Sequence, residues 1–108
     1  MSTGCVIKIL KKGLLMKCSK YLGKWNERYC VLTTERFLTY NREDQDADCT
    51  MDLFLKDIFD FSTTEYEDEY CFSFKCDDKI YRFKAESKES LQEWETEIKN
   101  ALNKDYIQ

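Results

Sequence analysis

The sequence predicts a mainly β fold, in which seven antiparallel strands form a small barrel capped by one C-terminal α-helix. Aromatic residues make up 15% of the chain, and aromatic side chains favour the half-buried surface of a pleated sheet. Short apolar segments alternate with short polar breaks along most of the sequence, as in an antiparallel meander. After Ala85 the apolar residues change to a helical period.

The strands are predicted where apolar and polar residues alternate, or where short apolar runs are bounded by turn-forming residues. They are expected at residues 13–18, 25–33, 36–40, 50–55, 58–62, 70–76 and 79–85. No proline, internal repeat or glycine-rich linker interrupts this order. One domain is therefore expected to fill the chain.

The last segment predicts an amphipathic helix that covers the open end of the sheet. Its apolar residues share one helical face. They are Leu91, Trp94, Ile98, Ala101 and Leu102. Trp94 is expected to be the main anchor, because burying its large apolar surface contributes most to packing. Ser87 or Ser90 is expected to cap the helix, and Ser90 with Glu93 has the form of a capping box.

The composition is that of an ordinary folded domain, with 43% hydrophobic and 35% charged residues. The sequence contains no apolar stretch long enough to span a membrane and no signal-peptide core, so a cytosolic protein is expected. The six cysteines are then expected to be free, mostly partly buried thiols, and Cys5 is also a candidate for acylation. A zinc site is not expected, because the chain has no histidine and no Cys-x-x-Cys pair.

Catalysis is not predicted. The sequence has no histidine base, no glycine-rich phosphate loop, no Gly-x-Ser-x-Gly elbow and no calcium-loop spacing. A cysteine nucleophile would lack its usual histidine partner. We therefore expect a monomeric binding protein that uses no metal and no cofactor.

The net charge of −4 conceals a strong asymmetry along the chain. Residues 1–42 contain nine Lys or Arg and two Glu, a net charge of +7, whereas residues 43–108 carry a net charge of −11. If the first part folds into one surface, that surface attracts anions and orients the molecule at a charged interface. The alternative is a scattered set of solvated charges.

Four segments resemble the pleckstrin-homology (PH) domain family. Residues 12–17, Lys-Gly-Leu-Leu-Met-Lys, are similar to its first strand, and residues 25–32, Trp-Asn-Glu-Arg-Tyr-Cys-Val-Leu, to its second. Residues 50–53 are similar to its fourth strand, and residues 85–94, which end in the tryptophan, to the entry into its helix. The resemblance implies a barrel of two orthogonal sheets, with the PH domain at residues 10–104, an extension at 1–9 and a tail at 105–108.

The resemblance also implies a phosphate site near the ends of the first two strands. In phosphoinositide-binding members, a late lysine in the first strand and a Lys/Arg-x-Arg motif in the second hold the phosphates. Strand alternation places Lys17, Asn26 and Arg28 on the inward faces, at the open mouth of the barrel. Asn26 departs from the family pattern because it brings no charge. Arg42, after the third strand, is expected to compensate, and an ion pair with the acidic loops is the alternative role for Arg28.

The segment between the first two strands is a second part of the predicted site. Lys20 and Lys24 flank Tyr21 and Leu22, an apolar tip between cations that suits insertion at a lipid headgroup boundary. The alternative is that Tyr21 and Leu22 pack on the rim of the barrel.

The sequence thus predicts a membrane-targeting or adaptor module that binds a phosphoinositide, another anionic phospholipid headgroup or an inositol phosphate. It would act in the cytoplasm, peripherally on the cytoplasmic face of membranes. The alternative is a protein–protein interaction module on the same barrel with little or no lipid binding. Nucleic-acid binding is not expected of an acidic chain without a familiar nucleic-acid motif.

Overall fold

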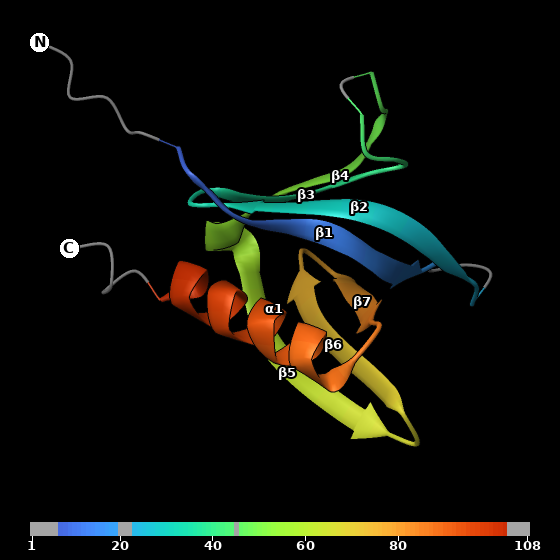
Figure 1. Ribbon diagram of the computed structural model, residues 1–108. Coiled ribbons are helices and arrows are strands. Elements are labelled where there is room, and N and C mark those ends of the chain that lie inside the picture. Colours follow the sequence, from blue (N-terminus) through green and yellow to red (C-terminus); the bar gives the residue numbers. More distant parts are fainter. Residues whose placement is uncertain (1–6, 20–22, 45, 104–108) are drawn as a thin grey trace, which may run out of the picture.

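A computed structural model describes residues 7–19, 23–44 and 46–103 (Figure 1). Its elements in chain order are β1 (Ile9–Cys18), β2 (Trp25–Thr33), β3 (Arg36–Tyr40), β4 (Cys49–Phe54), the short 3-10 helix η1 (Leu55–Asp57), β5 (Ile58–Tyr66), β6 (Glu69–Cys76), β7 (Lys79–Ala85) and α1 (Lys88–Leu102). The predicted mainly β class, with seven antiparallel strands and one C-terminal helix, is confirmed.

The strands form one hydrogen-bonded sheet in the order β4-β3-β2-β1-β7-β6-β5. Strand β1 pairs with β2 along most of its length, but with β7 only at Met16 and Lys17. The two halves that the resemblance implied, β1–β4 and β5–β7, are therefore joined at one corner through the end of β1. Figure 1 shows the two halves facing each other, with α1 beside the lower half.

The strand boundaries agree with the predictions for β2, β3 and β7 and differ elsewhere. Strand β1 begins at Ile9 because its first residues also pair with the end of β2. Strand β5 continues to Tyr66 because the polar residues after Ser62 form a ladder with β6. An exposed ladder of this kind has no apolar alternation that the sequence could reveal.

The core is a cluster of aromatic side chains enclosed by both halves of the sheet and by the helix. Phe37 from β3 lies 5.3 Å from Phe83 of β7 and 6.0 Å from Trp94 of α1, measured between ring centroids. Trp94 is 1% exposed, so its predicted role as the anchor of the helix is confirmed. Leu91, Ile98 and Ala101 are buried on the same helical face.

Of the two serines predicted as possible caps of the helix, the structure shows Ser87 in this role. The Ser90 N–H donates to the Ser87 side-chain oxygen at 3.1 Å, so Ser87 is the N-cap. The predicted capping box of Ser90 and Glu93 is wrong, because Glu93 accepts a hydrogen bond from the Lys11 ammonium at 3.1 Å instead.

The cysteines of the described residues form no disulfide. The five cysteines that the structure describes, Cys18, Cys30, Cys49, Cys71 and Cys76, are free. The candidate acylation site Cys5 lies outside the described residues. In the described part of the chain, no helix has the length and hydrophobicity needed to cross a membrane.

Candidate functional site

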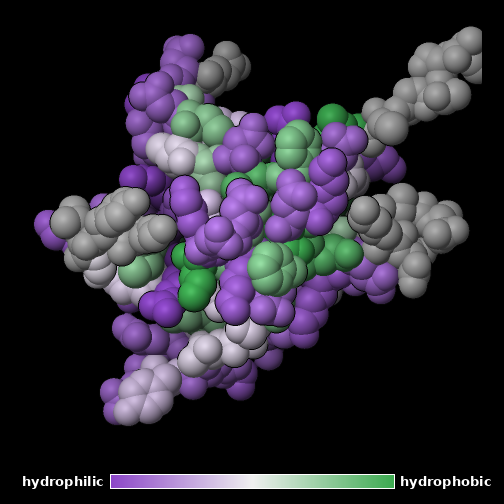
Figure 2. Space-filling model, turned by 180° about the vertical axis from the view of Figure 1, so that it is seen from behind, coloured by the Kyte–Doolittle hydropathy of each residue, from purple (hydrophilic) through white to green (hydrophobic). Residues whose placement is uncertain are grey.

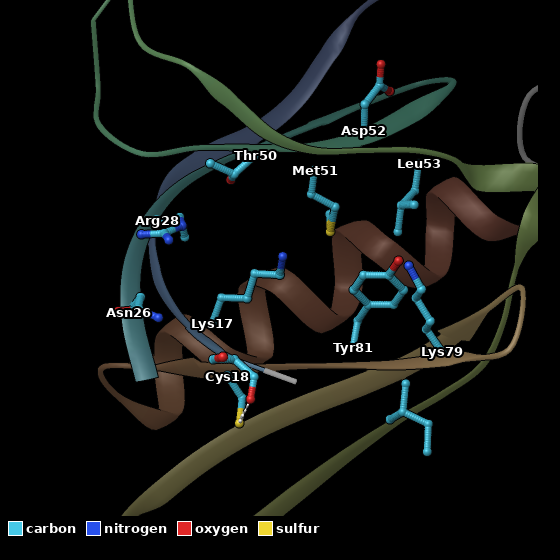
Figure 3. A pocket seen from close by; sticks show the side chains of 12 residues that line it. Lys17, Cys18, Asn26, Arg28, Thr50, Met51, Asp52, Leu53, Lys79 and Tyr81 are labelled. Atoms are coloured by element: carbon cyan, nitrogen blue, oxygen red, sulfur yellow. Dashed lines mark hydrogen bonds between the residues drawn. The ribbon is translucent and has the colours of Figure 1, made fainter. Parts of the chain in front are cut away.

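An open pocket of about 470 Å³ lies where the ends of β1 and β2 face β4 and the start of β7 (Figure 3). Lys17, Asn26 and Arg28, the three residues that strand alternation turned toward the mouth, all line it. Lys17 and Asn26 are direct partners in the β1–β2 ladder, and Arg28 follows two residues later on the same face of β2. The predicted placement of these three residues is therefore observed, and their role as lipid ligands stays a prediction.

Lys17 extends from the inward face of β1 into the pocket, where its side chain is half-buried (Figure 3). Its ammonium nitrogen lies 5.7 Å from the centre of the Tyr81 ring. Burial lowers the pKa of Lys17 below its ordinary value, and the positive charges of Arg28 and Lys79 lower it further. These surroundings thus disfavour the positive charge of Lys17, which a bound anion would favour.

Arg28 stands opposite the β4 wall and keeps most of its donors available. Its Nη1 donates to the Glu27 carbonyl oxygen at 2.8 Å. Within the described ranges, no carboxylate forms an ion pair with Arg28, so the structure does not show the alternative ion pair with the acidic loops. A guanidinium held in this way can still present a fork of N–H groups to a phosphate.

Two pocket residues, Lys79 and Tyr81, were missed by sequence reasoning. They lie at the start of β7, on the same face as the buried Phe83. The alternation of inward and outward residues along β7 is visible in the sequence. It does not show that Lys79 lies beside Lys17, because that also requires β7 to pair with the end of β1. That pairing, Lys17 with Phe83, is a contact between distant segments of the chain.

Strand β4 supplies the opposite wall. Met51 and Leu53 point into the pocket, whereas the Asp52 side chain points away from it (Figure 3). The Asp52 carboxylate accepts a hydrogen bond from Arg36 Nη1 at 3.0 Å. Because the Asp52 charge is paired on the outer side of the wall, it reduces the positive potential of the pocket only slightly.

The remaining predicted residues lie outside the pocket lining or outside the described residues. Arg42 does not line the pocket, because its guanidinium pairs with Asp44 in the β3–β4 connection. The same contact lowers the pKa of Asp44. Lys24 is exposed just before β2. Lys20, Tyr21 and Leu22 fall on residues that the structure does not describe.

The three pocket cations lack the carboxylate partners that many basic residues elsewhere have in the described part of the chain. In the described part of the chain, Lys17, Arg28 and Lys79 form no ion pair with a carboxylate. Paired basic residues include Lys11, Arg36, Arg42, Lys75, Lys84, Lys88 and Lys99. The pocket therefore concentrates uncompensated positive charge, which favours an anionic ligand.

The thiol of Cys30 does not supply a nucleophile. Cys30 is fully buried on β2, two residues beyond Arg28. Burial raises the pKa of its thiol to about 12, although Lys17 and Arg28 act against the rise. The Cys30 thiol is therefore neutral at physiological pH.

Comparisons with known proteins agree with the observed fold. The PH domain family model matches residues 9–103. A Slm1-PH domain, which binds ligand in a non-canonical site, has a TM-score of 0.71 at 22% identity, over 89% of this chain and 99% of that chain. Slm1-PH in complex with D-myo-inositol-4-phosphate has a TM-score of 0.69 at 24% identity, over 87% of this chain and 95% of that chain.

A third structure places the same fold within a larger protein. It contains a DH/PH fragment of PDZRHOGEF in complex with human RhoA, and it gives a TM-score of 0.74 at 16% identity, over 89% of this chain and 29% of that chain. At these identities the likeness to solved structures shows the fold alone. No curated protein sequence matches this chain.

Proposed function

The chain belongs to the PH domain family, whose model matches residues 9–103, and on this premise we propose that it is a membrane-targeting module that binds phosphate-bearing headgroups of anionic phospholipids. PH domains are generally non-catalytic modules. The proposed ligand site is the pocket between β1, β2, β4 and β7. The module would act in the cytoplasm, on the inner face of membranes.

The observation that carries the proposal is the convergence of three uncompensated cations on one pocket. Arg28 can place two N–H groups on one phosphate, and Lys17 and Lys79 can add compact positive charges. A phosphate monoester at neutral pH carries a charge of about −1.5 to −2. Such a group would relieve the mutual repulsion of the three cations.

The composition of the pocket also supports a relaxed choice of headgroup. Asn26 offers a hydrogen bond where phosphoinositide-binding relatives carry a third basic residue, and Lys79 enters from the other side of the pocket. Three cations match one phosphate monoester well and a highly phosphorylated ring poorly. Two Slm1-PH structures, with D-myo-inositol-4-phosphate and with phosphoserine, contain singly phosphorylated ligands, and Slm1-PH binds ligand in a non-canonical site.

Contact with the membrane would extend beyond the pocket. Lys24 is exposed beside it, and the neighbouring Lys20, Tyr21 and Leu22 remain candidates for headgroup contact and shallow insertion. Each cation near an anionic leaflet contributes about 1 kcal/mol. Several weak contacts of this kind would add to a modest pocket affinity and give reversible binding.

Vesicle sedimentation tests the proposal. Vesicles containing a phosphoinositide monophosphate, a phosphoinositide bisphosphate, phosphatidic acid or phosphatidylserine are compared with neutral vesicles at two salt concentrations. Lys17→Ala and Arg28→Ala should each weaken binding about tenfold, because each removes a charged phosphate contact. Lys99→Ala is the matched control, because Lys99 is exposed on α1 and pairs with Glu95. It removes the same charge and should leave binding nearly unchanged.

Two outcomes would contradict the proposal. If the wild-type protein stays in the supernatant with every anionic vesicle, the pocket is not a membrane site, and a protein-interaction module becomes the better account of the fold. If Lys99→Ala weakens binding as much as Lys17→Ala, only the net charge of the protein matters.

A further inference from the structure

Lys17 combines several features that bear on the reactivity of its amine. The amine points into the pocket and is half-buried (Figure 3). In the described residues it has no carboxylate partner, and its nitrogen lies over the Tyr81 ring, 5.7 Å from the ring centre. The open pocket leaves room for a small molecule to reach it.

The surroundings of the amine increase the share of its neutral form relative to a solvent-exposed lysine. Desolvation and the positive charges of Arg28 and Lys79 all lower the pKa of Lys17. The neutral form is the nucleophile, and a lysine that is desolvated or next to another cation is activated in this way. The two neighbouring cations can also hold a phosphate group, so one pocket would activate the amine and bind an anionic electrophile.

We propose that Lys17 is a covalent modification site for small phosphate-bearing aldehydes, with the phosphate against Arg28 and Lys79 and the aldehyde carbon at the Lys17 nitrogen. The nitrogen lone pair forms the C–N bond and gives a carbinolamine. The carbinolamine then loses its hydroxyl group as water, with both hydrogens of the neutral amine leaving the nitrogen in the two steps. The product is an imine, and no oxidation or reduction takes place.

The consequence for the protein follows from the position of the adduct. The imine would occupy the pocket and convert the primary amine of Lys17 into a bulky linkage. A headgroup phosphate could then no longer reach Arg28 and Lys79 together. The modification site uses the same pocket as the proposed function, but it does not depend on membrane binding.

The test uses pyridoxal 5′-phosphate, a phosphate-bearing aldehyde, followed by borohydride. Borohydride delivers hydride to the imine carbon and leaves a stable secondary amine that peptide mass spectrometry can locate. Lys17 should be labelled about tenfold faster than the exposed Lys24 and Lys99, because only Lys17 combines an activated amine with a phosphate site. Lys24 controls for position near the pocket, and Lys99 for general reactivity.

Three further measurements separate this site from ordinary lysine reactivity. Pyridoxal, which lacks the phosphate, should lose most of the preference for Lys17. Inorganic phosphate should slow the labelling of Lys17 but not of Lys99. This competition is measured on the wild-type protein, so it needs no variant. Arg28→Ala should lower the rate at Lys17 about tenfold, because one phosphate contact is lost.

Uniform labelling of the lysines, or equal labelling of Lys17 by pyridoxal with and without phosphate, would overturn the proposal. Vesicle binding distinguishes this failure from failure of the proposed function. Selective, phosphate-dependent labelling without vesicle binding would support the modification site and contradict the membrane role. Vesicle binding through Lys17 and Arg28 without selective labelling would do the reverse.

Discussion

At the scale of residues, the pocket brings like charges together, and their mutual repulsion is unfavourable. Lys17 is half-buried beside Arg28 and Lys79, and both neighbours lower the pKa of its ammonium. The rigid strands on which the three side chains stand prevent the charges from separating. A bound anion would reverse the effect and raise the pKa of Lys17 toward its ordinary value.

Asn26 gives the sharpest prediction about headgroup choice. Asn26→Lys adds a fourth cation to the pocket, so binding of multiply phosphorylated inositides should tighten about tenfold relative to singly phosphorylated ones. The measurement is vesicle sedimentation with matched lipid charge density. Arg42→Ala is the control, because Arg42 is paired with Asp44 outside the pocket lining. An unchanged lipid profile for Asn26→Lys would count against this placement of the site.

The sequence predicted the β1 and β2 cations and Asn26 of this pocket for a clear physical reason. Lys17, Asn26 and Arg28 lie on adjacent strands joined by a short connection, so period-two alternation was enough to place them on one face. Lys79 and Tyr81 required the pairing of β7 with β1, which depends on contacts between distant segments. Arg42 was placed by analogy of position, and its local ion pair with Asp44 could not be foreseen.

At the scale of elements, the β5–β6 hairpin has a turn whose residues oppose its geometry. Glu67 and Asp68 have φ angles of 48° and 65°, and Tyr66 pairs directly with Glu69. Two positive φ values in a two-residue loop are typical of a type I′ turn, which favours Asn-Gly. The native Glu-Asp pair therefore carries conformational strain.

Replacing this pair with Asn-Gly should stabilise the protein. Glu67→Asn combined with Asp68→Gly should raise the free energy of unfolding by about 1 kcal/mol, measured by urea denaturation. The control is Glu67→Gln with Asp68→Gln, which removes the same charges without favouring positive φ. Equal stabilisation by both double variants would show that relief of charge repulsion, and not turn geometry, causes the gain.

The start of α1 gives a second element-level prediction. Ser87→Ala should lower the free energy of unfolding by about 1 kcal/mol, because it removes the acceptor for the Ser90 N–H. Ser90→Ala should cost much less, because the Ser90 side chain is not the cap. Thermal or urea unfolding of the two variants compares them directly. A larger loss of unfolding free energy for Ser90→Ala than for Ser87→Ala would contradict the Ser87 cap and support the capping box of Ser90 and Glu93.

At the scale of the whole molecule, the positive pocket lies far from an acidic hairpin, in which Glu65 pairs with Lys88 and Glu69 with Lys84. The exposed residues 65–69 of the β5–β6 hairpin include four acidic side chains, at the opposite end of β6 from the pocket. The eight residues of β6 correspond to a separation of about 25 Å. Figure 2 shows one face of the molecule, on which charged and polar side chains surround smaller apolar areas. This polarity would orient the pocket toward an anionic surface.

The fold was more predictable than the site because it depends on repeated local patterns. Alternation located all seven strands, and the helical spacing of Leu91, Trp94 and Ile98 located α1 and its buried face. Local pattern did not reveal the short helix η1, the polar end of β5 or the joining of both halves through β1. The joining depends on segments far apart in the sequence, whereas the end of β5 is a polar ladder without apolar alternation.

The central claim is that this pocket binds a phosphate-bearing headgroup, and backbone amide NMR during titration with inositol 4-phosphate tests it most directly. The account predicts the largest, saturable shifts at Lys17, Asn26, Arg28 and Lys79, with small shifts in the β5–β6 hairpin and at Lys99. The Lys17→Ala variant should need about tenfold more ligand. Saturable shifts centred elsewhere on the sheet, or no saturable shifts at millimolar ligand, would contradict it.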